Sequence, residues 1–198
     1  MNTIRIVLAS QSPSRKVMLE NAGLSLDMRP AAIDEASVHQ NLAGKTPPEL
    51  AAALAQIKAL AIAKAERGRL VLGADQILVC DGKLFHKPAS LAEARTQLQA
   101  LRGNTHELIS AACLARDASV LWQGADSACL TMRGFSDEFL DAYLTALGDR
   151  ALSSVGAYQL EGLGVQLMTR IKGDYFTILG LPLLPVLAAL REHGVIAR

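Results

Sequence analysis

The sequence predicts an α/β protein, built as a single domain over residues 1–198 or as two small lobes that share a sheet. Three observations support this prediction. About half of the 198 residues are apolar, which is enough for a proper core. Predicted strands and helices alternate through the first half of the chain. The apolar run Leu70–Cys80 lacks polar alternation, which is typical of a strand buried on both faces.

The first predicted segment is a strand, a serine-rich turn and a helix. Ile4–Ala9 is the strand and Lys16–Ala22 is the helix. Between them, Ser12 and Pro13 are typical of a helix start, because the hydroxyl accepts from an N–H group and proline needs no partner there. Arg15 adds a charge that can bind phosphate beside the free N–H groups of the first turn. The turn is therefore either an anion site or a plain capped helix with a surface arginine.

A second strand, Leu24–Met28, and a polar loop over residues 29–45 precede a long helix. Thr46-Pro47-Pro48-Glu49 has the spacing of a capping box, which predicts that the helix begins there. Its apolar stripe includes Leu50, Leu54 and Ile57. Lys58 follows this stripe directly, so its side chain is either solvated or reaches inwards along its stem.

The strand Leu70–Cys80 contains one carboxylate, Asp75, directly after Gly73-Ala74. Acidic side chains are seldom buried unless they are paired, bound to metal or used in chemistry. Asp81-Gly82 then predicts a tight hairpin turn, which would return Lys87 towards the level of Asp75. The two charges would form either part of a metal–nucleotide site or an ordinary ion pair.

The second half of the chain is predicted to contain helices, two long strands and a glycine-rich stretch. The predicted elements are a helix from Ser90 to about Leu101, strands His106–Ala115 and Val120–Met132, a helix after Ser136, a hairpin turn over residues 171–174, a strand Tyr175–Leu179 and a helix Leu183–Glu192. Glycines at positions 156, 162 and 164 permit close backbone approach to a ligand, although loops alone also explain them.

Charge and cysteine content argue against several classes of protein. Twenty basic and 19 acidic residues leave a net charge of +1, so bulk charge does not indicate a nucleic-acid partner. No apolar run approaches the roughly 20 residues of a membrane helix, and the amino terminus lacks a signal-peptide layout. Cys80, Cys113 and Cys129 lie in apolar runs and are expected to be buried thiols. We therefore expect a cytoplasmic protein with no membrane partner.

Three groups of short motifs occur in order along the chain. They are Leu8-Ala9-Ser10-Gln11-Ser12-Pro13-Ser14-Arg15; Gly73-Ala74-Asp75 with His86-Lys87-Pro88; and Gly156-Ala157-Tyr158-Gln159-Leu160-Glu161-Gly162 with residues 171–176 and 180–183. Together they resemble the Maf family of nucleoside triphosphate pyrophosphatases, once named for septum formation. The resemblance runs from Ile4 to about Arg191. It implies a mixed twisted sheet with flanking helices, two lobes around a deep cleft, a fold similar to inosine triphosphate pyrophosphatases, and a homodimer as a plausible assembly.

The resemblance implies a hydrolase that cleaves a nucleoside triphosphate between its α- and β-phosphates with Mg²⁺ or Mn²⁺. By this resemblance Asp75 is the proton acceptor, and Glu35 is its partner for metal and water. The positions that hold the triphosphate match Ser10, Arg15, Lys58 and Lys87. Because Mg²⁺ prefers carboxylate and phosphate oxygens, Asp75 acts either as a base or as a metal ligand.

Three departures from the family pattern bear on the choice of base. Ser14 stands where arginine is common, Gln76 where threonine is common, and Glu161 where glutamine is common. Gln76 and Glu161 resemble the subgroup that acts on 7-methyl-GTP rather than on dTTP or UTP. A carboxylate can accept from guanine N1–H and N2–H₂, and methylation at N7 adds positive charge to the base. His86 stands where glycine is common, and nothing in the sequence explains it.

Two classes of function follow from the resemblance. The first is a pyrophosphatase that favours 7-methyl-GTP, with a dTTP/UTP-type enzyme as the alternative. The second is a nucleotide-binding regulator of septum formation with little hydrolysis, which Ser14 in place of arginine favours. Retention of the acids Asp75 and Glu35 together with both lysines favours the enzyme, because a pure binder has no evident need for this set.

Overall fold

The structure is a computed structural model that describes residues 4–33, 38, 42 and 44–197. It divides into two compact units. The first unit comprises Met1–Gln76, Ile109–Asp126 and Gly180–Arg198, and the second comprises Ile77–Leu108 and Ser127–Leu179. That the chain forms a single domain around a deep cleft stays a prediction.

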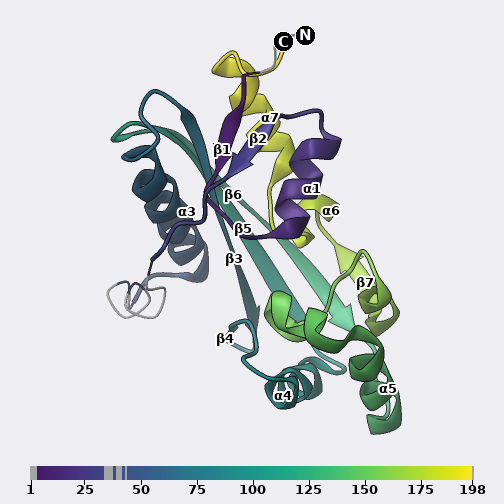
Figure 1. Cartoon of the computed structure of the whole chain (residues 1–198). Coiled ribbons are helices and arrows are strands. Elements are labelled where there is room, and N and C mark those ends of the chain that lie inside the picture. Colours follow the sequence, from purple (N-terminus) through teal and green to yellow (C-terminus); the bar gives the residue numbers. More distant parts are fainter. Residues whose placement is uncertain (1–3, 34–37, 39–41, 43, 198) are drawn as a thin grey trace. The chain divides into compact units, whose positions relative to one another are not determined.

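Over the described residues, seven strands form one mixed sheet (Figure 1). The strand order is β2-β1-β3-β5-β6-β7, and β4 pairs with β3. β1 is parallel to β2 and β3, whereas the β3–β4 and β6–β7 pairs are antiparallel. The predicted mixed sheet with flanking helices is therefore confirmed. The strands are β1 (Ile6–Leu8), β2 (Leu26–Met28), β3 (Leu70–Cys80), β4 (Lys83–Phe85), β5 (Thr105–Arg116), β6 (Ser119–Met132) and β7 (Met168–Lys172).

The three helices that follow Ser12, Ser90 and Ser136 begin where the capping signals predict. The hydroxyls of Ser12, Ser90 and Ser136 each accept a hydrogen bond from a backbone N–H three residues further on. Among the described residues, no helix is long and apolar enough to cross a membrane. The α-helices are α1 (Pro13–Asn21), α3 (Pro47–Ala63), α4 (Leu91–Leu101), α5 (Asp137–Leu147), α6 (Tyr175–Ile178) and α7 (Leu183–Glu192), and the 3₁₀ turns are η1 (Gly148–Ser153), η2 (Val155–Ala157) and η3 (Leu163–Leu167).

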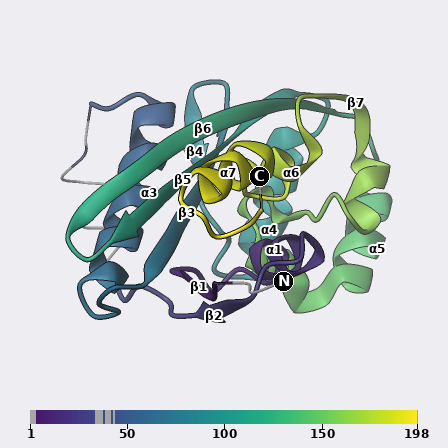
Figure 2. The same ribbon diagram turned by 90° about the horizontal axis from the view of Figure 1, so that it is seen from above.

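In the first unit, β1 lies between two parallel neighbours that follow it in the chain. α1 connects β1 to β2, and α3 connects β2 to β3 on the other side of β1. Because such crossovers have one hand, the two helices cover opposite faces of the sheet. α3 lies on one face, and α1 and α7 lie on the other (Figures 1 and 2). The buried side chains between these layers include Ile6, Leu8, Leu19, Leu54, Leu70, Leu72, Ile109 and Leu114.

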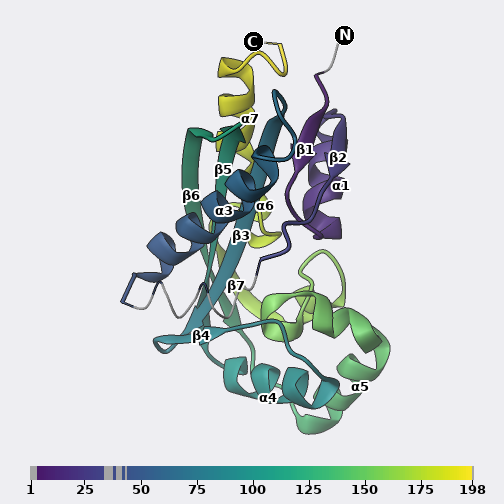
Figure 3. The same cartoon turned by 60° about the vertical axis from the view of Figure 1, so that its left-hand side comes forward.

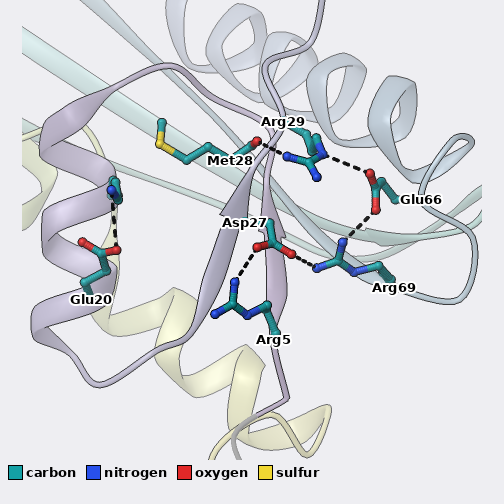
Figure 4. A network of polar contacts seen from close by, with 8 residues as sticks. Arg5, Glu20, Asp27, Met28, Arg29, Glu66 and Arg69 are labelled. Atoms are coloured by element: carbon teal, nitrogen blue, oxygen red, sulfur yellow. Dashed lines mark hydrogen bonds and ion pairs between the residues drawn. The ribbon is translucent and has the colours of Figure 1, made fainter.

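A network of ion pairs holds the edge strand β2 (Figure 4). Asp27 of β2 lies 2.6 Å from both the Arg5 and the Arg69 guanidinium groups. Hydrogen bonds from Arg69 and Arg5 hold the pKa of the Asp27 carboxyl below its usual range. Glu66 extends the network, because it pairs with Arg69 at 2.8 Å and with Arg29 at 3.3 Å. Charges along an edge strand discourage pairing with another chain. The network should therefore protect β2 from pairing with a strand of a second molecule.

The prediction of a strand at Tyr175–Leu179 is wrong, because Tyr175–Ile178 form the short helix α6. The Asp174 carboxylate accepts a hydrogen bond from the Thr177 N–H at 2.9 Å, which stabilises the first turn of a helix. The predicted hairpin turn at residues 171–174 is also wrong. Strand β7 continues to Lys172, and Asp174 then caps α6.

The expectation of three buried thiols is wrong for one of them. Cys80 and Cys113 are buried, whereas Cys129 is exposed. Side chains alternate between the two faces of a strand. The neighbours of Cys129 in β6, Ala128 and Leu130, are buried, so Cys129 lies on the opposite, exposed face.

The second unit has its own core, packed between the sheet and the helices α4 and α5 (Figure 3). His106 and Tyr158 form a buried polar pair within it, with the imidazole Nε2 2.6 Å from the phenol oxygen. Burial lowers the pKa of His106 to about 4 and raises the pKa of Tyr158. The imidazole is therefore neutral in the folded protein at neutral pH.

The His106 pair predicts acid sensitivity. An unfolded histidine titrates near pH 6.5, so the unfolded chain binds more protons than the folded one between pH 6.5 and about 4. The contribution of neutral His106 to the free energy of unfolding is complete above pH 6.5. By pH 4 the loss of this contribution should have lowered the free energy of unfolding by about 3 kcal/mol. Urea unfolding at pH 7 and pH 4 measures this loss, which His106→Gln should largely remove. His193→Gln is the control, and an unchanged loss in His106→Gln would contradict the assignment.

Candidate active site

The candidate site lies in the first unit, where β1 ends beside the longer strand β3. β1 pairs with β3 through Val7↔Val71 and Leu8↔Leu72, and the Ala9 N–H donates to the Leu72 carbonyl at 2.8 Å. The crossovers from β1 and to β3 lie on opposite faces, so this is the topological switch point at which α/β sheets bind ligands. Ser10 and Asp75 follow the last paired residues of the two strands.

Asp75 and Lys58 form a close ion pair. The Lys58 Nζ lies 2.6 Å from Asp75 Oδ1, and the two side chains are only 12% and 11% exposed. Of the two interpretations of the sequence, a solvated Lys58 or one that reaches inwards, the structure therefore supports the second. Breaking a buried pair by removing one partner is strongly destabilising, so the pair fixes both side chains in place.

Arg15 is buried and bridges three segments of the first unit. Its Nε donates to the Gly180 carbonyl at 2.7 Å, and its Nη1 donates to Ser10 Oγ at 3.0 Å and to the Ala74 carbonyl at 3.1 Å. Only 9% of Arg15 is exposed, so the alternative of a surface arginine is wrong. These three acceptors are neutral. A guanidinium at this position can also attract an anion such as phosphate.

Ser10 is buried between the start of α1 and the end of β1. Its oxygen accepts from the Ser12 N–H at 3.2 Å as well as from Arg15. A serine oxygen has two acceptor positions, and both are used here. The Ser10 O–H can therefore act as a donor to a ligand oxygen.

Gln76 faces away from Asp75, because neighbouring residues of a strand point to opposite faces. Its Nε2 donates to Ser110 Oγ of β5 at 3.2 Å. Its Oε1 and the Arg15 guanidinium both lie within 3.6 Å of the Cβ position that Gly180 lacks. Ser14 is half-buried in the first turn of α1. No sequence pattern indicated Ser110, and Gly180 was included only within a family motif.

The remaining predicted residues of the described chain, Lys87 and Glu161, belong to the second unit. Lys87 is exposed between β4 and α4, and the Gln97 side chain holds this segment by donating to the His86 carbonyl at 3.0 Å. β4 ends at Phe85, so the predicted return of Lys87 to the level of Asp75 stays a prediction. The other predicted metal ligand, Glu35, lies outside the described residues.

Glu161 is exposed on a tight glycine turn. The Gly162 and Gly164 N–H groups donate to the Gln159 carbonyl at 3.1 and 3.0 Å. A Cβ at Gly164 would lie 2.4 Å from that carbonyl oxygen, so only glycine permits the turn. The glycines of this motif therefore shape a rigid turn that presents the Glu161 carboxylate.

Comparisons with known proteins agree with the motifs. A family model described as Maf-like protein matches residues 5–193. A 7-methyl-GTP pyrophosphatase of Rhizobium etli is 50% identical over 196 residues, which cover 98% of each chain. A nucleoside triphosphate pyrophosphatase of Nitrobacter winogradskyi is 48% identical over 97% of this chain and 95% of that protein. A HAM1 protein structure from Coxiella burnetii matches 64% of this chain and 70% of that chain at 23% identity, with a TM-score of 0.41.

Proposed function

The chain belongs to the Maf-like protein family, and we propose from this that it is a nucleoside triphosphate pyrophosphatase that prefers 7-methyl-GTP. The reaction would release the nucleoside monophosphate and pyrophosphate, which makes the protein a hydrolase of acid anhydrides. The observation that carries the proposal is the buried Lys58–Asp75 pair at the switch point of the sheet, beside Ser10 and Arg15.

Asp75 is the residue best suited to the chemical step. Lys58 holds the Asp75 carboxylate in one position, which is what a base needs in order to accept the proton of an attacking water. Phosphoryl transfer depends mainly on position and on neutralisation of charge. Arg15, Lys58 and Lys87 would supply the positive charge, and the Ser10 O–H would donate to a phosphate oxygen.

A divalent metal fits this set of residues. Within the described residues, no group of three His, Cys, Asp or Glu side chains could hold a metal ion. Mg²⁺ does not require such a group, because it is usually held by one or two carboxylates together with substrate phosphates. Asp75 and Glu35 would be the protein ligands of Mg²⁺ or Mn²⁺. A bound metal would neutralise charge on the triphosphate oxygens.

The preference for base would come from Gln76, Glu161 and Ser14. The Glu161 carboxylate can accept from the N1–H and N2–H₂ groups of guanine, and a cationic 7-methylguanine strengthens both bonds. The hydrogen bond to Ser110 fixes the Gln76 amide. The relative from Rhizobium etli is named as a pyrophosphatase of the same substrate, 7-methyl-GTP.

Hydrolysis of a nucleotide panel tests the function. The purified protein is incubated with Mg²⁺ or Mn²⁺ and with 7-methyl-GTP, GTP, UTP or dTTP, and pyrophosphate and nucleoside monophosphate are measured. We expect both products, with the highest kcat/KM for 7-methyl-GTP. Release of orthophosphate in place of pyrophosphate, or binding without hydrolysis, would refute the proposal, and the second result would favour the regulator.

Lys87 should act on the triphosphate and not on the base. Lys87→Met should lower kcat/KM by a similar factor for all four nucleotides, because the triphosphate is common to them. Loss of one hydrogen bond to a charged group, worth about 1.5–3 kcal/mol, corresponds to about a 10- to 150-fold decrease. Lys83→Met, at an exposed position of β4, is the matched control. A change in the ranking of bases would contradict this role for Lys87.

A further inference from the structure

The helix α3 carries a row of buried small residues, two of which contact β3 at Gly73. Ala51, Ala55, Ala59 and Ala63 are spaced four residues apart and are fully buried. Residues at this spacing share one face of a helix. We call these four residues the alanine seam. A seam of methyl groups lets a helix approach its neighbour more closely than larger side chains would allow.

Gly73 meets the alanine seam from the side of the strand. A Cβ at Gly73 would lie 2.3 Å from the Ala55 carbonyl oxygen, 2.6 Å from the Ala59 nitrogen and 2.8 Å from the Ala59 Cβ. Two of these atoms belong to the helix backbone, so no change of rotamer could relieve the contact. Helix and strand would have to separate by about 1 Å before the shortest of these contacts reached the 3.4 Å at which ordinary contact begins.

The close contact and the ion pair are adjacent in both elements. Lys58 precedes Ala59 in α3, and Asp75 lies two residues after Gly73, on the same face of β3. The distance between helix and strand at Gly73 therefore sets how far the Lys58 side chain must reach. At the observed separation, Lys58 Nζ lies 2.6 Å from Asp75 Oδ1.

We propose that Gly73 is a positioning residue, which with the alanine seam holds α3 close enough for Lys58 to fix the Asp75 carboxylate. The proposal rests on the proposed pyrophosphatase function for its effect on the rate. Gly73 would touch neither substrate nor metal. It would act only through the Lys58–Asp75 pair. A residue with a general role in packing would instead affect activity whether or not this pair is present.

A double-mutant cycle distinguishes the two roles. Gly73→Ala should lower kcat for 7-methyl-GTP by about 10- to 100-fold, since a displacement of 1 Å can cost about 100-fold. In the Lys58→Met background the same substitution should lower kcat by less than about 3-fold, because the contact through which it acts is already lost. An equal loss in both backgrounds would show a role in packing alone and would overturn the proposal.

A second variant and a structural measurement complete the test. Ala59→Val enlarges the same contact from the helix side and should have the same effect, even if Gly73→Ala does not fold. Ala94→Val, at a fully buried position of α4, is the matched control and should change kcat by less than about 3-fold. Crystal structures of the folded variants should place Lys58 Nζ beyond hydrogen-bond distance of Asp75, and an unchanged contact would overturn the proposal. This measurement decides the proposal even if the wild-type protein released no pyrophosphate, a result that would refute only the proposed function.

Discussion

Replacement of Asp75 with asparagine is expected to lower kcat by about 10²- to 10⁴-fold, the range that a positioned proton acceptor contributes. Asparagine keeps the size of the side chain and one oxygen, but it loses the charge that binds Lys58 and accepts a proton. The effect should appear with every nucleotide, because the chemical step is common to them. Steady-state kinetics with 7-methyl-GTP and UTP measure it.

Loss of the charge should also lower stability, because Asp75 and Lys58 form a buried pair. Removing one partner of such a pair costs about 3–5 kcal/mol. The double variant Asp75→Asn, Lys58→Met separates the two effects, since it removes both charges and should regain stability without regaining activity. Thermal unfolding monitors stability. If Asp75→Asn retained a turnover within about 10-fold of the wild type, Asp75 would not be the catalytic residue.

The sequence predicted most elements of the fold because their signals are local. Serine caps and apolar periodicity depend on residues a few positions apart, and they located α1, α4 and α5. Tyr175–Ile178 was misjudged because its aromatic and β-branched residues favour a strand. The cap at Asp174 decided the conformation, and over four residues one capping bond can exceed a weak strand propensity.

The candidate site was less predictable because its contacts join distant parts of the chain. Arg15 and Gly180 are 165 residues apart, and no local pattern indicates that one donates to the other. Lys58 could be solvated or buried on sequence grounds alone. Only the structure shows that its side chain reaches Asp75, with Nζ 2.6 Å from Oδ1. The motifs therefore indicated candidate residues for the site, whereas only the structure shows that Lys58 pairs with Asp75.

Glu161→Gln is expected to change the preference for base. Glutamine keeps one acceptor, introduces a donor and removes the charge that favours a cationic 7-methylguanine. Loss of a charged hydrogen bond costs about 1.5–3 kcal/mol, so kcat/KM for 7-methyl-GTP should fall by about 10- to 150-fold. GTP should lose less because its base is neutral. UTP and dTTP should be unchanged or improve, because a carboxamide can donate to their carbonyl oxygens whereas a carboxylate repels them.

The position of Glu161 and a charge control in the same unit allow a change in kcat/KM to be assigned to contact with the base. Glu161 is exposed on a turn that the Gly162 and Gly164 N–H groups fix, so the substitution should leave the fold intact. Glu138→Gln, which removes an exposed acid from the first turn of α5 in the same unit, controls for the change in net charge. Values of kcat/KM for the four nucleotides are compared between the two variants and the wild type. An equal decrease in kcat/KM for all four nucleotides in Glu161→Gln would mean that Glu161 does not contact the base. Only a contact with the base distinguishes guanine from a pyrimidine.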